Sequence, residues 1–357
     1  MPAALATIVV AARETFSHAM DSLQSIYAFT RVPFSLVYVD GNSPPNVSAY
    51  LKQQAAQREF KLLRVDHYLS GNESRNLALP AIDTKYVVFM DNDVHVMPGW
   101  LGALIACAEE TGASIVEPVY CGGSFEKLLV YAAAPDVCIR DQAGMRTLHE
   151  SANHAYERLS DIRPQLSRKQ CSLAKFQCML VRRDVFDRIG ALDASLMSFF
   201  ENVDLSIAVN AAAGSIWFEP RAVVTHFPPP PLAPMDMPLF FLRWSDAWLR
   251  PSIRRFCYKH GVRENDDGVL GHVRYRDKRR HDLMRFTRAS VRRLMGHRAL
   301  RLADAAVDRL FYGGIVEQLI VAKAERQRRQ CRSILPALLD GSAQAEPHSC
   351  ARLSKAV

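Results

Sequence analysis

Four apolar runs rich in β-branched and aromatic residues alternate with helix-like stretches over the first hundred residues. Continuous apolar strands separated by helices are typical of a parallel sheet that helices cover on both faces. In such a sheet, ligands bind outside the carboxyl ends of the strands. The predicted strands are Leu5–Ala12, Phe34–Asp40, Phe60–Val65 and Tyr86–Met90, and the predicted helices lie near residues 15–29, 46–58 and 72–80.

The pattern is less regular from about residue 120, and it becomes helical and basic from residue 274. Six prolines within residues 228–238 break regular structure and predict a rigid, extended connection. The elements predicted before this connection are a strand at Phe176–Val181, helices at Asp184–Ile189 and Asp204–Ala213, and two short strands at Ser215–Glu219 and Ala222–Thr225.

The composition is that of a soluble globular protein, since 49% of the 357 residues are apolar and 23% are charged. These values exclude a disordered, collagen-like or disulfide-scaffold chain, and no apolar stretch approaches the ~20 residues that a membrane span requires. The start, MPAALATIVVAARE, lacks a basic leader region, so we expect no signal peptide and a cytoplasmic protein. The eight cysteines contain no C-x-x-C pair, which favours reduced thiols over sulfur-bound metal.

The net charge of +8 is concentrated near the C-terminus. Residues 274–332 hold 17 Lys and Arg against 6 Asp and Glu, a net +11, so the remainder of the chain is net −3. Such a segment could contact nucleic acid, anionic lipid headgroups or an acidic polymer, or could be only a solvated helical face. It has no RNP, zinc-finger or helix-turn-helix signature, so we expect no specific nucleic-acid binding.

Two carboxylates, Asp91 and Asp93, directly follow the fourth apolar run and form a D-x-D motif. In an extended segment, alternation would point both side chains the same way. Hard cations such as Mg²⁺ or Mn²⁺ usually combine one or two carboxylates with substrate phosphates. A cation that holds a diphosphate makes it a better leaving group, because it neutralises the charge that develops. Surface loops also contain D-x-D by chance, so the motif alone is weak evidence.

Further polar segments are expected near the same edge of the sheet. Asp40 ends the second apolar run, and Ser70–Asn76 opens a helix that offers backbone N–H groups and a guanidinium to a phosphate or base. Far downstream, Glu201 and Asp204 lie at a helix start, where a helix-capping role is the alternative for either acid. Together these features favour a ligand site.

The order of these motifs resembles the family 2 glycosyltransferases with the GT-A fold. VDGNS, SGNESRN and VVFMDNDVHVMPGWL are similar to the nucleotide-sugar half of that family, and CMLVRRDVFDRIGALDASLMSFFENVDLSIAV resembles its acceptor half. The resemblance covers about residues 5–227; each motif is loose, but five in the correct order make a specific signal. It implies an α/β fold with a Rossmann-like, mixed but mostly parallel sheet and helices on both faces, extended by basic C-terminal helices.

The resemblance also implies domain boundaries. Residues 1–227 would form the catalytic domain, with a nucleotide-sugar half at 1–119 and an acceptor half at 120–227. Residues 228–273 would form the proline-rich connection and an acceptor-side segment. Residues 274–357 would form the basic helical extension with a flexible tail.

Carried over by position, the resemblance implies a donor site and a cofactor, Mn²⁺ or Mg²⁺. Asp93 would ligate the metal directly, Asp91 would face the ribose and the water shell of the metal, and His226 would ligate the metal or contact the diphosphate. A lone histidine is more often structural. The residues implied to bind the nucleotide sugar are Ala11, Ala12, Glu14, Asp40, Arg75, Asn76, Asp91 and Asn92.

One position departs from the family pattern, because Glu201 is followed by Asn202 where the family has an aspartate that takes the acceptor's proton. Asparagine cannot accept a proton in that way, and an inverting displacement needs a base near the attacking oxygen. Glu201 or Asp204 would then be the base, or the enzyme would lack a side-chain base, as retaining transferases similar to the mucin-type GalNAc transferases do. We favour inversion with Glu201 or Asp204 as the catalytic base.

The acceptor side is less defined by the sequence. Asn202 is assigned to it, and the RWSDAW segment could place Trp244, Asp246 and Trp248 as a platform, since aromatic faces stack on sugar rings. The alternative for this segment is a packed helix face with Trp248 in the core.

The function implied is transfer of a hexosyl or N-acetylhexosaminyl group from a nucleotide-diphospho-sugar, with UDP-sugar favoured, to a hydroxyl. The acceptor would be a glycan or lipid-linked glycan in glycan, polysaccharide or glycolipid synthesis. Residues 274–332 would hold the enzyme on the anionic inner face of the membrane. The alternatives are a retaining transferase that acts on a protein hydroxyl and a non-catalytic nucleotide-sugar or glycan binder, which Asn202 keeps open.

Overall fold

The computed structural model of the protein describes residues 3–123, 127–142, 144–226, 233–282 and 314–332, with single positions between 293 and 309. Residues 228–232 of the predicted proline-rich connection and residues 333–357 of the predicted C-terminal extension lie outside the described residues. The expectation of an extended connection is wrong for residues 234–238, because 234–236 form a turn and Pro238 lies in the first turn of a helix, where its missing N–H has no intrahelical partner to lose. The predicted boundary after residue 227 therefore stays a prediction.

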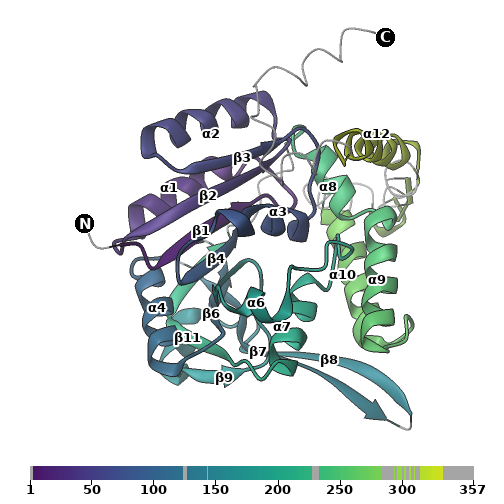
Figure 1. Ribbon diagram of the computed structural model, residues 1–357. Helices are drawn as coiled ribbons and strands as arrows, with labels where there is room; N and C mark the ends of the chain where they lie inside the picture. Colours follow the sequence, from purple (N-terminus) through teal and green to yellow (C-terminus); the bar gives the residue numbers. More distant parts are fainter. Residues whose placement is uncertain are drawn as a thin grey trace.

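The N-terminal half of the chain forms the parallel part of one central sheet, in the order β3-β2-β1-β4 (Figure 1). Every side chain of β1 and β4 is buried, which explains why both strands are continuous apolar runs in the sequence. The four predicted strands are confirmed at β1 (Ala6–Ala11), β2 (Phe34–Gly41), β3 (Lys61–Val65) and β4 (Tyr86–Asp91), and the helices between them at α1 (Ala19–Phe29), α2 (Pro45–Arg58) and α3 (Gly71–Ala78).

The other part of the sheet mixes strand directions. Strand β10 (Cys178–Arg182) lies antiparallel between β4 and β6 (Ile115–Gly122), while β11 (Ile216–His226) runs parallel to β6. Two short strands were predicted where β11 is one strand. Its register shifts between Glu219 and Val223, around Pro220, because proline has no N–H to give to the ladder. The remaining short strands are β5 (Val94–Val96) and β9 (Lys169–Cys171), both antiparallel to β11.

Helices cover both faces of the sheet, as predicted. One core cluster packs α1, α2 and α4 (Trp100–Thr111) on one face. A second cluster packs the other face with α3, α5 (Leu159–Ile162), α6 (Val185–Ile189) and α7 (Glu201–Ala211). The carboxyl ends of the parallel strands stay between these layers and remain available for a site.

A long hairpin of β7 (Leu129–Gln142) and β8 (Met145–Asn153) extends beyond the sheet (Figure 1). It leaves the sheet where β7 pairs with the end of β6. Residues 120–170 showed no clear pattern, and this hairpin was not predicted.

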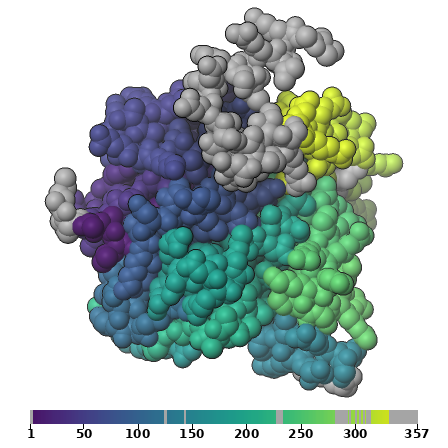
Figure 2. All heavy atoms as spheres, viewed as in Figure 1, coloured from purple at the N-terminus to yellow at the C-terminus, as the bar shows by residue number. Residues whose placement is uncertain are grey.

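The C-terminal segment contains α8 (Met237–Arg243), α9 (Asp246–His260), α10 (Asp267–Asp282) and α12 (Ile315–Arg332), which confirms a helical extension. A third core cluster joins these helices to β7, β8 and α7, and the rings of Phe200 and Phe256 stack with centroids 4.3 Å apart. With all atoms drawn, the green and yellow C-terminal segments lie directly against the blue and teal body (Figure 2). In the part of the chain that the structure describes, no helix combines the length and the apolar character needed to cross a membrane.

Glu117 is a carboxylic acid inside the sheet. Its side chain is fully buried in β6; Oε2 accepts a hydrogen bond of 2.8 Å from the backbone N–H of Lys175, and Oε1 has no partner. Burial raises the pKa of Glu117 to about 8. The folded protein therefore keeps a proton that the unfolded chain releases above about pH 4.3, so stability falls as the pH rises from there to about 8.

We expect Glu117→Gln to raise the free energy of unfolding at pH 8 by roughly 2–4 kcal/mol and to change it little at pH 4. Glutamine removes the ionisable proton, and its carbonyl oxygen can still accept from Lys175. Urea unfolding at both pH values measures this, with the exposed Glu264→Gln as the matched control. Equal gains from the Glu117 change at both pH values would contradict the prediction.

Candidate active site

The residues predicted to bind the donor collect where β1, β2 and β4 end. Parallel strands present their carboxyl ends at one edge of the sheet, so the loops after them are neighbours. Ala11 ends β1 and pairs in register with Asp91 at the end of β4, while the loop after β1 continues through Ala12 to Glu14. The register of the sheet therefore places the first loop beside the D-x-D motif.

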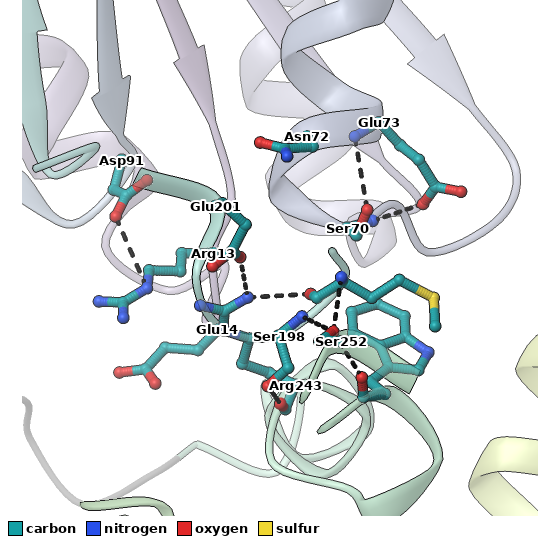
Figure 3. Close-up of polar contacts among 12 residues, drawn as sticks. Arg13, Glu14, Ser70, Asn72, Glu73, Asp91, Ser198, Glu201, Arg243 and Ser252 are labelled. Carbon is teal, nitrogen blue, oxygen red and sulfur yellow. Dashed lines mark hydrogen bonds and ion pairs between the residues drawn. The ribbon is translucent and has the colours of Figure 1, made fainter. Parts of the chain in front are cut away.

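Asp91 is buried between two arginines. Its Oδ1 accepts a hydrogen bond of 3.2 Å from Nη2 of Arg75. Its Oδ2 lies 3.9 Å from Nε of Arg13 and has no hydrogen-bond partner; Figure 3 shows this pair with Arg13. Burial raises the pKa of Asp91 to about 6, although both guanidinium groups oppose that shift. One oxygen of this buried carboxylate thus has no hydrogen-bond partner.

Asp93 has a different partner. Its Oδ2 lies 3.0 Å from Nε2 of His226, the last residue of β11. Asn92 and Asp93 form a turn rather than extended chain, so the alternation expected of an extended segment does not apply to Asp91 and Asp93. Burial raises the pKa of Asp93, but the neighbouring His226 outweighs this and holds it well below its usual range.

These side chains include ligand atoms of the kinds that a divalent cation binds. Among the described residues no three His, Cys, Asp or Glu side chains could enclose a metal by themselves. Asp93 and His226 nevertheless offer a carboxylate oxygen and a ring nitrogen, and Asp91 has its unpaired Oδ2. Mg²⁺ and Mn²⁺ need few protein ligands when substrate phosphates and water supply the others. The residues therefore fit a cation that is shared with a diphosphate.

Helix α3 carries Arg75 toward Asp91. Ser70 and Glu73 form a capping box at its N-terminus, which satisfies backbone N–H groups there (Figure 3). The guanidinium of Arg75 lies over the ring of Phe176, 3.6 Å from its centroid. Asn76 uses its amide on Leu192, accepting from its N–H at 2.9 Å and donating to its carbonyl at 2.8 Å. Its predicted contact with the nucleotide stays a prediction.

Asp40 closes the loop after β2. Its oxygens accept from the backbone N–H of Ser43 at 2.8 Å, from the Ser43 hydroxyl at 2.9 Å and from Arg64. The carboxylate thus fixes the loop at the edge of the site, and its contact with a base or ribose stays a prediction.

The loop after β1 is held by residues far away in the sequence. Glu14 accepts from Nε1 of Trp244 at 2.8 Å and from Arg279 at 2.5 Å. Asp236 accepts from the backbone N–H groups of Phe16 and Ser17 at 2.6 and 3.1 Å, and Asn92 donates to the Thr15 carbonyl at 2.8 Å. The C-terminal segment therefore helps to fix the loop after β1 in the candidate donor site.

Glu201 is the first residue of α7, and its side chain points toward Arg243. Its Oε1 accepts from Nη1 of Arg243 at 2.5 Å, and Nη1 also donates to the Met197 carbonyl at 2.9 Å (Figure 3). Burial alone would raise the pKa of Glu201. The ion pair and hydrogen bond with Arg243 outweigh this effect, so the pKa of Glu201 lies below its usual value. Glu201 is therefore an ionised acceptor near Arg75, whose charge also lowers its pKa.

Asp204 lies one turn further along α7 and faces α9. Its carboxylate accepts from Nζ of Lys259 at 2.7 Å and lies 2.7 Å from Nε2 of His260. Asn202 donates to the carbonyl of Ala174 at 3.3 Å. Of the two candidate bases, Glu201 is the one linked to Asp91, because it interacts with the charge of Arg75, which donates a hydrogen bond to Asp91.

The predicted aromatic acceptor platform is not at the surface. Trp244 and Trp248 are 0% and 1% exposed, so neither ring can stack on a sugar in this arrangement. Asp246 starts α9, and its carboxylate is paired with Arg276, Arg280 and Arg250. The packed-core alternative describes this segment, because α8 and α9 bury these rings against their neighbouring helices.

Sequence reasoning missed Arg13, Arg243 and Arg279. Arg13 stands inside the loop whose neighbours were selected, and Arg243 is a lone charge in the apolar segment PLFFLRW. A single charge within an apolar run signals a buried ion pair, so the position of Arg243 was detectable. The pairing of Arg279 with Glu14 spans 265 positions and had no local signal.

Comparisons with known proteins place the chain in a family. The family model described as glycosyl transferase family 2 matches residues 7–190, which is more than half of the chain. An uncharacterized protein, y4gI, of Sinorhizobium fredii (strain NBRC 101917 / NGR234) is 24% identical over 231 residues, which are 62% of this chain and 24% of that protein. The O-antigen biosynthesis protein RfbC of Myxococcus xanthus is 27% identical over 201 residues, which are 53% of this chain and 14% of that protein.

The chain thus spans a quarter or less of the length of these curated relatives. Among solved structures, GalNAc-T7 with UDP, GalNAc and Mn²⁺ matches with a TM-score of 0.50 and 14% identity, over 73% of this chain and 55% of that one. At that identity the likeness shows the fold alone, which is the GT-A arrangement predicted from the motifs. The chain belongs to glycosyl transferase family 2 and has a GT-A-like fold.

Proposed function

We propose that this glycosyltransferase moves a hexosyl or N-acetylhexosaminyl group from a nucleotide-diphospho-sugar to a hydroxyl, with Mn²⁺ or Mg²⁺ as cofactor. The observation that carries the proposal is the Asp93–His226 pair beside the arginine-bound Asp91, at the carboxyl ends of the strands. UDP is the favoured nucleotide, and the solved structure of GalNAc-T7 with UDP, GalNAc and Mn²⁺ supports that choice.

The charges of the site suit a metal-bound diphosphate. Without His226, the acids and arginines gathered there balance in number: Asp91, Asp93, Glu14 and Glu201 against Arg13, Arg75, Arg243 and Arg279, of which Arg13 and Arg279 are only partly buried. A diphosphate diester carries two negative charges and the cation two positive charges, so the complex adds no net charge to a buried cluster. An unpaired buried charge would be costly. This balance supports metal-dependent donor binding.

Each side chain then has a defined role. Asp93 and His226 would hold the cation, which supplies charge neutralisation at the departing diphosphate. Arg13 and Arg75 would orient Asp91, whose unpartnered Oδ2 would accept from a ribose hydroxyl. Glu14, fixed by Trp244 and Arg279, would shape the nucleobase side of the loop after β1.

For the chemical step we propose inversion with Glu201 as base. Of the two candidate acids, Glu201 is the one that pairs with Arg243 and interacts with the charge of Arg75. The lowered pKa of Glu201 keeps it ionised, as a base must be, but makes it a weak one. Weak basicity also suits the alternative, in which Glu201 of a retaining enzyme only accepts a hydrogen bond from a hydroxyl of the donor sugar. A binder without catalysis would release no nucleotide from any donor, so donor hydrolysis separates that alternative from both mechanisms.

The relative named for O-antigen biosynthesis supports a polysaccharide or lipid-linked glycan as acceptor. We propose a cytoplasmic enzyme that touches the anionic inner membrane face through residues 274–332. Among the described residues, the outward side of α12 joins Ile315 and Leu319 to Lys323, Arg326 and Arg329.

Flotation with vesicles of phosphatidylcholine with and without phosphatidylserine measures this membrane contact. Replacing Lys323, Arg326 and Arg329 by Gln should weaken binding to the anionic vesicles by roughly tenfold or more, at about 1 kcal/mol per basic residue near the surface. The control is the same triple replacement at Arg31, Lys52 and Lys61, which lie in the N-terminal half. Equal flotation of the α12 variant and the wild type would contradict the contact.

Calorimetric titration of UDP, GDP, dTDP and CDP, each with and without Mn²⁺, tests the donor proposal. We expect one nucleotide to bind tightly only with the metal. Absence of metal-linked binding for all four would remove the proposed donor site.

A further inference from the structure

Three exposed apolar side chains gather at the base of the β7–β8 hairpin. Leu129, Tyr131 and Tyr156 are 37%, 39% and 69% exposed. Tyr131 and Tyr156 meet edge to face, with centroids 6.0 Å apart and an interplanar angle of 87°. The backbone joins them as well, since the N–H of Tyr156 donates to the carbonyl of Val130 at 2.6 Å. An exposed apolar patch of this kind marks an interaction site.

The patch is continuous with the proposed metal side of the donor site. The ring of Tyr131 lies 5.4 Å from that of Tyr120, centroid to centroid. Tyr131 also covers Gly122, where a Cβ would come within 2.2 Å of the ring. Gly122 is the register partner of His226, whose ring contacts Asp93. A row of three tyrosine rings therefore runs from the end of β6, beside the metal ligands, to the surface.

The backbone holds Tyr156 in an unfavourable conformation. Its φ is 66°, in the left-handed region that bulky residues rarely adopt, and His154 has a φ of 58°. Backbone hydrogen bonds hold this turn after β8, because Val130 donates to the Glu157 carbonyl at 2.9 Å and Glu157 donates to the His154 carbonyl at 3.2 Å. Such strain persists where the surroundings impose it and is concentrated at functional sites. Core packing does not explain it here, since most of the Tyr156 side chain is exposed.

We propose that Tyr131 and Tyr156 form the acceptor subsite, on which a pyranose ring of the acceptor glycan packs. An aromatic face is flat and apolar with a polar edge, and it matches the C–H face of a pyranose, whose hydroxyls point outward. The polar pair of His154 and Glu157, 3.1 Å apart, borders the patch and can meet those hydroxyls. This proposal rests on the proposed function, because it places the acceptor beside the diphosphate that leaves.

The size of the patch favours a sugar over a protein partner. A stable protein interface buries about 1,200 Å² or more in total. Three partly exposed side chains offer roughly 300 Å² at most, since a whole aromatic side chain buries about 150–250 Å². Continuity with the donor site also points to the acceptor of the reaction, whose attacking hydroxyl must reach the carbon bound to the diphosphate.

Saturation-transfer NMR tests the subsite with methyl glycosides of glucose, galactose, mannose, rhamnose and N-acetylglucosamine, in the presence of UDP and Mg²⁺. We expect at least one glycoside to receive saturation at its ring C–H protons from the wild type. Binding should weaken about tenfold in Tyr156→Ala and persist in Tyr156→Phe, because the ring face carries the contact. Tyr258→Ala is the matched control, since this α9 tyrosine is 85% exposed.

The UDP affinity, measured on the same samples, should be equal in all variants. If the wild type binds UDP but no glycoside, or if Tyr156→Ala binds the glycosides as tightly as the wild type, the subsite is wrong. A wild-type dimer in sedimentation that Tyr156→Ala dissociates would make the patch a contact between copies and would also overturn it. If the wild type binds no nucleotide while glycoside binding still depends on Tyr156, the donor proposal fails and the subsite stands.

Discussion

In Asp93→Asn, we expect Mn²⁺ to lose its effect on nucleotide affinity. The wild type should bind its nucleotide roughly 100-fold more tightly with the metal than without it, and the variant should show equal, weak binding in both cases. A neutral amide oxygen is a poor ligand for a hard cation, and the change also deprives His226 of its carboxylate partner at 3.0 Å. Calorimetric titration with and without Mn²⁺, followed by EDTA, measures the effect.

Asp83→Asn is the matched control for this variant. Asp83 is an exposed carboxylate before the other end of β4, so its replacement should leave metal-linked binding unchanged. Thermal unfolding of both variants separates loss of a ligand from loss of the fold. If Asp93→Asn folds and still binds the nucleotide in a metal-dependent way, Asp93 does not hold the cation and the D-x-D motif is only a turn.

In Glu201→Gln, we expect turnover of the donor to fall about 10²- to 10⁴-fold while UDP and metal still bind. The glutamine carbonyl can keep the hydrogen bond from Arg243, so the pocket should stay formed, but the amide cannot accept a proton. Asp204→Asn is the informative comparison. It should lower the unfolding temperature by disturbing Lys259 and His260, with turnover reduced less than about tenfold.

Release of UDP from UDP-glucose, UDP-galactose and their N-acetylhexosamine analogues measures turnover of the two variants before the natural acceptor is known. The anomeric configuration of the released sugar, read by proton NMR within the first minutes, separates inversion from retention. Loss of turnover in Asp204→Asn with normal turnover in Glu201→Gln would reverse the assignment of the base. Retention would favour the alternative role, in which Glu201 only accepts from a hydroxyl of the donor sugar.

Much of the fold could be predicted from the sequence because its signals are local. A strand buried on both faces must be apolar throughout, so β1 and β4 stand out, and the helices between them follow. The position of Asp91 could be predicted from an equally local signal, because a polar residue directly after a buried strand must lie at the edge of a sheet. The β7–β8 hairpin was not predicted because β8 is largely exposed and neither strand has a strong apolar alternation.

The amino-acid sequence by itself determined the family, the parallel core and the cluster of carboxylates at the strand ends. Only the tertiary structure decided which partner each carboxylate has. Asp91 lies with Arg75, Asp93 with His226 and Asp204 with His260, and these pairs are separated by 16, 133 and 56 positions. Whether an acid is a ligand, a base or an anchor depends on such partners, because burial and neighbouring charge set its protonation and its direction. Contacts between distant residues leave no periodic trace in the chain, so they emerge only when the fold brings the segments together.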